Sequence, residues 1–129
     1  MENSTLKVRL WFSYILQGIV VLFLLMGAIN NIMKTEVALA SSKELGYSEK
    51  SLLPLAFVLL FGIVCYAIPR GSIFGAVILT AWFGGAVATH IIHGDDFSTI
   101  ILPVVFAIIV WATIGLRNKK VQSIILLEK

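Results

Sequence analysis

Hydrophobic residues gather in four long runs, and a short polar segment separates each run from the next. The runs are Leu10–Ile32, Leu52–Ile68, Ile73–Ile92 and Ile100–Leu116. At about 1.5 Å rise per residue, even a run of about 17 residues reaches roughly 25 Å as a helix, close to the hydrocarbon thickness of a bilayer. A helix satisfies its own backbone hydrogen bonds inside lipid, so the pattern predicts four membrane-spanning helices.

We expect an all-α transmembrane four-helix bundle that forms a single domain over residues 1–129. Its helices should cover about residues 8–33, 52–68, 72–93 and 98–116, with a tail over residues 117–129. Pro69-Arg70-Gly71 predicts a tight antiparallel turn, and Gly94 is suited to end a helix in the left-handed conformation. The segment Lys34–Leu45 is weakly periodic, and it either extends the first helix or lies on the membrane surface. The first run is longer than the core of a signal peptide, so we expect it to be retained.

Composition agrees with a membrane protein, since hydrophobic residues make up 59% of the chain and charged residues 13%. Soluble domains carry about 25% charged residues. The formal charge of +3 is modest and its cations lie beside the apolar runs, so we expect lipid headgroups as their partner and no nucleic acid. Cys65 is a single cysteine, so no disulfide forms within the chain.

Positive charges predict the orientation in the membrane. With both termini on one side, seven of the ten Lys and Arg residues lie on that side. The positive-inside rule then favours both termini in the cytoplasm, and we expect a multi-pass protein of a bacterial inner membrane.

Glycine and other small residues are frequent in the third run. Gly71 and Gly75 form a Gly-x-x-x-Gly pair, and Ala81, Gly85 and Thr89 extend a ladder of small residues on an adjacent face. Such faces let helix backbones approach closely. We expect packing within the bundle, with a homo-oligomer contact or room for a ligand as the alternatives.

Two histidines mark the end of the same run. His90 and His93 are three residues apart on one helix face, and Asp95 and Asp96 follow at once. These atoms suit a divalent metal, but at a membrane boundary helix capping or a His–Asp hydrogen bond is the simpler interpretation. Haem held by both histidines within one chain is excluded in practice, because both lie on one helix. We therefore expect no metal and no cofactor.

Gln17 lies within the first run, where amides usually hydrogen-bond across helices; a polar lining for a small cavity is the alternative. The runs otherwise lack Asp, Glu, Lys and Arg in their interiors, which disfavours an ion pump or a proton-coupled transporter. No catalytic constellation is recognisable, so we expect no autonomous catalysis.

Four short motifs stand out along the chain: Gly46-Tyr47-Ser48, Ile68-Pro69-Arg70, Phe74-Gly75-Ala76 and Gly84-Gly85-Ala86-Val87-Ala88-Thr89-His90. With these motifs the chain resembles, over nearly its whole length, the DoxX-like family of small bacterial membrane proteins. It implies a four-helix membrane bundle and an association with quinone-linked redox systems.

We therefore expect a non-catalytic accessory or anchoring subunit beside an oxidoreductase. The alternative is a membrane protein that binds a small molecule or quinone, and an oligomeric transporter is the weakest hypothesis. The candidate ligand-binding residues are His90, His93, Gly84, Gly85 and Gln17.

Overall fold

The computed structural model describes residues 1–128 and is built from helices. In chain order they are α1 (Glu2–Ile32), α2 (Glu36–Glu44), the 3₁₀ helix η1 (Glu49–Ser51), α3 (Leu52–Ala67), α4 (Ser72–His93), α5 (Phe97–Arg117) and α6 (Lys119–Ile125). Within residues 1–128, four segments are long and apolar enough to cross a bilayer, namely α1, η1 with α3, α4 and α5. The expected all-α transmembrane four-helix bundle is confirmed.

The two ends of the chain are more helical than the sequence suggested. α1 begins at Glu2 rather than near residue 8, and the hydroxyls of Ser4 and Thr5 donate to the Met1 carbonyl in its first turn. The region expected to be a tail contains α6, whose first backbone N–H groups are capped by the Asn118 side chain. Val121 of α6 is buried in the core cluster, so this segment belongs to the bundle.

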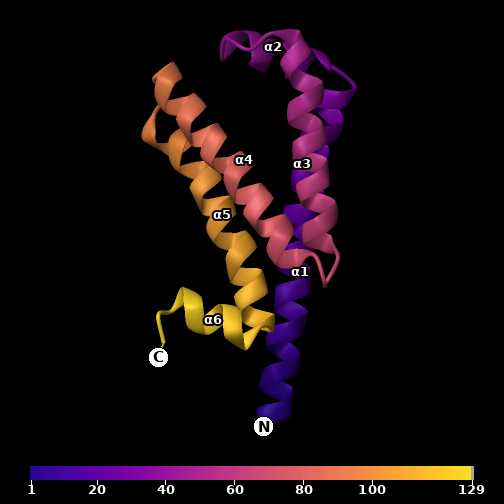
Figure 1. Cartoon of the computed structure of the whole chain (residues 1–129), viewed down its shortest axis with the longest axis vertical. Coiled ribbons are helices and arrows are strands. Elements are labelled where there is room, and N and C mark those ends of the chain that lie inside the picture. Colours follow the sequence, from indigo (N-terminus) through magenta and orange to yellow (C-terminus); the bar gives the residue numbers. More distant parts are fainter. Residues whose placement is uncertain (129) are drawn as a thin grey trace.

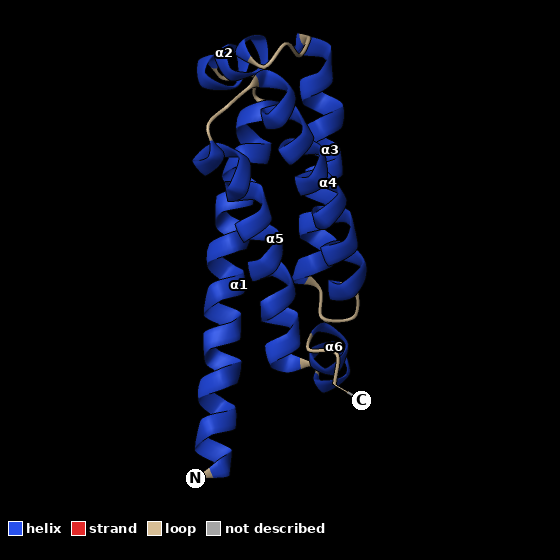
Figure 2. Cartoon of the chain, turned by 90° about the vertical axis from the view of Figure 1, so that its left-hand side faces the viewer, coloured by secondary structure: helices blue, strands red, loops and turns tan. Residues whose placement is uncertain are grey.

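The four long helices form a ring in which each packs mainly against two others. α1 contacts α3 and α5, and α4 contacts the same two helices. Figures 1 and 2 show α6 and the N-terminus at one end of the bundle, which we call the terminal end, and α2 at the other, the α2 end. A pair of helices, α4 and α5, leans away from α1 and α3 toward the α2 end (Figure 1).

The turn between α3 and α4 brings two backbones unusually close. A Cβ added at Gly75 would lie 2.5 Å from the Tyr66 Cα and closer still to the Tyr66 backbone nitrogen. Glycine is therefore required at this position, and the Gly71–Gly75 pair packs α4 against the end of α3, as its spacing predicted.

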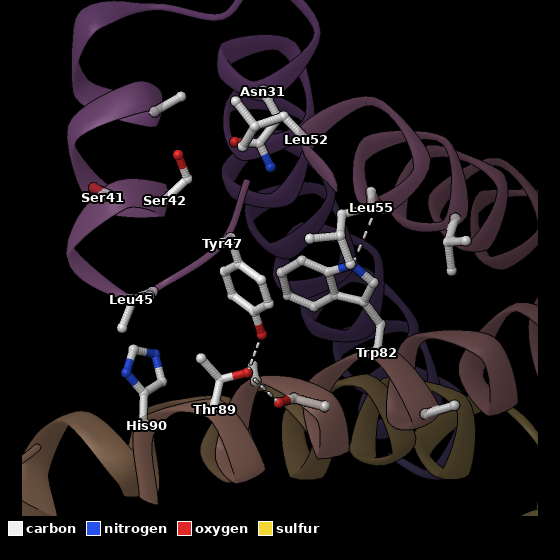
Figure 3. A pocket seen from close by; sticks show the side chains of 15 residues that line it. Asn31, Ser41, Ser42, Leu45, Tyr47, Leu52, Leu55, Trp82, Thr89 and His90 are labelled. Atoms are coloured by element: carbon white, nitrogen blue, oxygen red, sulfur yellow. Dashed lines mark hydrogen bonds between the residues drawn. The ribbon is translucent and has the colours of Figure 1, made fainter. Parts of the chain in front are cut away.

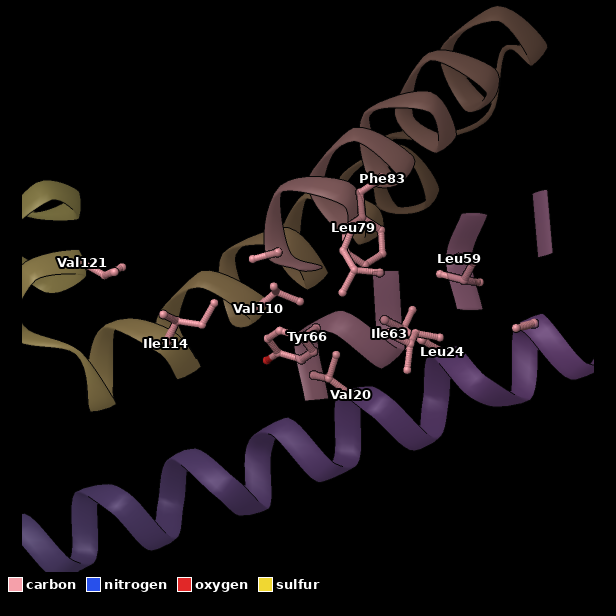
Figure 4. Packing of buried hydrophobic residues seen from close by; sticks show 12 residues of the cluster. Val20, Leu24, Leu59, Ile63, Tyr66, Leu79, Phe83, Val110, Ile114 and Val121 are labelled. Carbon is pink, nitrogen blue, oxygen red and sulfur yellow. The ribbon is translucent and has the colours of Figure 1, made fainter. Parts of the chain in front are cut away.

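Figure 4 shows the buried side chains meeting along the bundle axis, with Tyr66 and Leu79 at the centre. Aromatic rings extend this cluster, since Phe106 stacks on Phe23 at 4.9 Å between centroids and on Phe83 at 6.1 Å. The outward faces of the long helices are also apolar, and Phe12, Ile19 and Leu22 of α1 are each more than half exposed. A continuous apolar exterior of this kind suits lipid as the surrounding solvent.

Candidate functional site

A cavity of about 460 Å³ opens at the α2 end of the bundle. It lies between α4 on one side and α2, α3 and the segment between them on the other (Figure 3). This volume is within the usual range for sites that hold small molecules. Most of its wall is apolar, and this part consists of Ala38, Leu45, Leu52, Leu55, Val58, Ala81, Trp82, Gly85 and Ala86. The polar part consists of Asn31, Ser41, Ser42, Tyr47, Thr89 and His90.

Small residues of α4 make room for this cavity. Ala81, Gly85 and Thr89 recur every four residues and share one face of the helix, and all three line the cavity. A Cβ added at Gly85 would meet no heavy atom within 4 Å in the described part of the chain. The expectation that this ladder packs against another helix is thus wrong for Gly85, because the helices diverge at this level and leave open space.

The His90 side chain is held in place by a carboxylate just beyond the end of α4. His90 Nδ1 lies 2.6 Å from Asp95 Oδ2, and His93 Nδ1 lies 2.7 Å from Asp95 Oδ1. Gly94 provides the reversal that allows these contacts, with a left-handed φ of 83°. Hydrogen bonds from His90 and then His93 hold the pKa of the Asp95 carboxyl below its usual range. Asp95 is therefore a carboxylate near neutral pH that accepts from both imidazoles.

Tyr47 reaches across the cavity from the segment that precedes α3. Its hydroxyl is hydrogen-bonded to the Thr89 hydroxyl on α4, and Thr89 Oγ1 in turn donates to the Gly85 carbonyl at 2.9 Å. Figure 3 shows Tyr47 and Trp82 side by side, with the Trp82 indole donating to the Leu55 carbonyl at 3.3 Å. These bonds tie the polar rim of the cavity to both of its walls.

The structure brings together some of the residues predicted for a site and separates others. Gly85 and His90 line the cavity, whereas Gly84 and His93 lie beside it without lining it. His93 shares Asp95 with His90, and Gly84 faces outward. Gln17 belongs to the opposite end of the bundle, so these candidates do not form one site.

Gln17 lies in a hydrogen-bond network at the terminal end. Its Nε2 donates to the Tyr66 carbonyl at 2.9 Å, and its Oε1 accepts from Arg117 at 2.5 Å. The Arg117 guanidinium also lies 4.6 Å from the centre of the Tyr14 ring, a cation–π contact. The predicted role of Gln17 in bonding helices together is confirmed.

Most of the cavity lining was absent from the predicted site residues, and Asn31 and Trp82 show why. Asn31 lies at the end of α1 and Trp82 in the middle of α4, far apart in sequence. Their proximity depends on how the helices pack, which the sequence does not show. The signal in the sequence that pointed to a cavity here was the ladder of small residues on α4.

Asp96 stabilises the start of α5, because its carboxylate accepts hydrogen bonds from the Ser98 and Thr99 hydroxyls at 2.5 and 2.7 Å. Within residues 1–128, no group of three or more His, Cys, Asp or Glu side chains is placed to hold a metal ion.

A comparison with protein-family models finds that residues 15–113 match the model of the DoxX-like family. The chain belongs to this family. The match runs from α1 to α5 and includes every residue that lines the cavity. Comparison with the curated proteins and with the solved structures found no match.

Membership of the DoxX-like family and the apolar helices together establish a multi-pass membrane protein. α6 lies beyond the matched region, and it packs against α5. The two candidate features for a function are therefore the cavity at the α2 end and the polar network at the terminal end.

Proposed function

We propose that this DoxX-like protein binds a small amphiphilic molecule, of the size and character of a quinone, in the cavity at the α2 end. The observation that carries this proposal is the division of one cavity into an apolar wall and a polar rim. Trp82, Leu52 and Leu55 form a wall suited to a ring or an alkyl chain, while Tyr47, Thr89 and His90 lie at the rim. Ligand sites commonly pair apolar walls with a few oriented polar groups in this way.

The role expected first from the sequence, an accessory subunit beside a membrane oxidoreductase, is compatible with such a site. A subunit that holds a lipophilic molecule serves an oxidoreductase by presenting or storing that molecule in the bilayer. We place binding before anchoring because the cavity supports binding directly. Purification in mild detergent would recover an oxidoreductase under the accessory hypothesis, and a protein that purifies alone would count against it.

The binding proposal is tested with Trp82 as the reporter. Replacing Trp11 and Trp111 with Phe leaves Trp82, one of three tryptophans, as the source of indole fluorescence. A benzoquinone with a decyl tail is titrated into the protein in micelles, and contact with the cavity wall quenches Trp82 saturably.

Two adjacent glycines give matched variants. Gly85→Leu fills the cavity, whereas Gly84→Leu places the same side chain outside it, and an added Cβ at either position meets no heavy atom within 4 Å among the described residues. We expect saturable quenching to be lost in Gly85→Leu and kept in Gly84→Leu. Equal quenching in both variants would refute the proposal.

We further propose that both termini face the cytoplasm and that the membrane is a bacterial inner membrane. Seven of the ten Lys and Arg residues lie on the terminal side of the spanning segments, which supports this orientation. The cavity would then face the periplasmic half of the bilayer.

A further inference from the structure

Hydrogen-bond donors around the cavity are largely engaged within the protein. A carboxylate accepts and cannot donate, so the Nδ1 atom of His90, 2.6 Å from Asp95 Oδ2, carries a proton. In the neutral form of the imidazole, the other ring nitrogen, Nε2, is then left with a lone pair. In Figure 3 the His90 ring rises from α4 toward Leu45, within the cavity.

The hydroxyls at the rim follow the same rule. Thr89 donates its single hydroxyl proton to the Gly85 carbonyl, so in its contact with Tyr47 the threonine oxygen accepts and the tyrosine donates. Ser42 donates to the Leu39 carbonyl at 2.9 Å. Each of these oxygens keeps lone pairs but no proton for a ligand.

The lining contains two side chains whose protons are not engaged in this way, Asn31 and Ser41. An amide such as Asn31 accepts as well as donates, so it suits either kind of head group. Among the described residues that line the cavity there is no Asp, Glu, Lys or Arg, so an uncharged head group suits it better than an ion.

We infer that the cavity selects an amphiphile whose head group donates a hydrogen bond, such as a phenol or the reduced quinol, over one with carbonyl or ether oxygens. This inference rests on the proposed binding function and adds its chemical selectivity. We assign His90 Nε2 as the acceptor for the proton of the ligand's head group. Asp95 is a positioning residue, because it fixes the imidazole tautomer.

The test compares hexylphenol with its methyl ether, which has the same ring and chain but no hydroxyl proton. Each displaces the decyl quinone from the Trp82 reporter protein, and the ratio of the two affinities is measured in every variant. Because both compounds partition into the same micelles each time, changes in the ratio between variants report on the site.

Two histidines provide the matched substitutions. His90→Phe removes the acceptor and keeps a ring, and His93→Phe makes the same change at the neighbour that also contacts Asp95 but does not line the cavity. We expect the preference for the phenol to fall about threefold to tenfold in His90→Phe, the range for one lost hydrogen bond, and to be unchanged in His93→Phe. An unchanged preference in His90→Phe would overturn the inference.

A second measurement needs no variant. Nitrogen-15 NMR of the histidines in the ligand-free protein distinguishes the two imidazole tautomers, and we expect a protonated Nδ1 at His90. The opposite tautomer overturns the inference.

The two proposals fail separately. If hexylphenol and its methyl ether displace the quinone equally, the selectivity is refuted while binding stands. If quenching by the quinone itself does not respond to Gly85→Leu, the proposed function is refuted.

Discussion

Single residues of α4 divide this helix into a packed half and an open half. Gly75 is pressed against the backbone of α3, whereas Gly84 and Gly85 have open space where a side chain would be. The same residue type therefore serves two purposes on one helix. Near the turn it permits close contact between helices, and at Gly85 it leaves the cavity open.

Replacing Gly75 with alanine should destabilise the bundle. The new Cβ would lie 2.5 Å from the Tyr66 Cα, and because the obstacle is backbone, the two helices must move apart. We expect a loss of about 1–3 kcal/mol in the free energy of unfolding, typical of overpacking. Denaturation by sodium dodecyl sulfate in mixed micelles measures it.

Gly27→Ala on α1 is the control for that experiment. An added Cβ at Gly27 meets no heavy atom within 4 Å among residues 1–128, so this variant should unfold like the unmodified protein. Equal stability of the two alanine variants would show that the contact with Tyr66 is not tight.

The Asp95 carboxyl should titrate below the usual aspartate pKa, because His90 and His93 donate to it. A carboxyl whose pKa is lower in the folded state stabilises the fold above the unfolded pKa of about 3.9, and this contribution is lost as the pH falls through the folded pKa. Carbon-13 NMR of Asp95 follows the titration directly.

The two histidines should contribute unequally to that lowered pKa. The hydrogen bond from His90 is the largest cause, so His90→Phe should return the Asp95 pKa toward its usual value more than His93→Phe does. A titration of Asp95 at its ordinary pKa in the unmodified protein would contradict the bridging arrangement.

At the scale of elements, the long helices could be predicted, whereas α6 could not. The apolar runs that become α1, α3, α4 and α5 are continuous, and lipid leaves them no alternative to a helix. The seven-residue helix α6 is stabilised by the Asn118 cap and by the burial of Val121 in the bundle. Helices this short are not stable alone, so a local pattern says little about them.

The contact between α1 and α5 is an element-scale interaction that can be measured. Gln17 Oε1 accepts from Arg117 at 2.5 Å, and a double-mutant cycle with Gln17→Leu and Arg117→Met isolates this pair from the Tyr14 contact. We expect a coupling of about 0.6 kcal/mol and at most about 1.7 kcal/mol, as found for hydrogen bonds between membrane helices.

Gln17→Leu combined with Arg9→Met is the matched control cycle. Arg9 donates to the Leu116 carbonyl at 3.0 Å and lies about 12 Å along α1 from Gln17, so the two substitutions should be additive. Coupling as large in this control as in the first cycle would indicate a general loosening of α1 instead of a specific bond.

At the scale of the whole molecule, the cavity arises because the bundle is tight at one end and open at the other. Residues spread from Asn31 to His90 meet there, and outside the Ala81, Gly85 and Thr89 ladder no local spacing relates them. Sequence reasoning reached His90 and Gly85 because histidine and glycine stand out within an apolar run. It placed Gln17 in the same candidate set because the sequence does not distinguish a polar residue that binds a ligand from one that hydrogen-bonds to another helix.

The arrangement of the two ends predicts their accessibility in cells. Ser41 of α2 and Glu128 after α6 are both exposed and lie at opposite ends of the bundle, so in the proposed orientation Ser41 faces the periplasm and Glu128 the cytoplasm. In a Cys65→Ser background, a membrane-impermeant maleimide added to intact spheroplasts should label Ser41→Cys, whereas Glu128→Cys should react only after lysis. Cys65 lies within α3, and its replacement removes background labelling. Labelling of Glu128→Cys alone in intact spheroplasts would invert the orientation and place the cavity on the cytoplasmic side, and labelling of both would contradict the odd number of membrane crossings, by α3, α4 and α5, between the two positions.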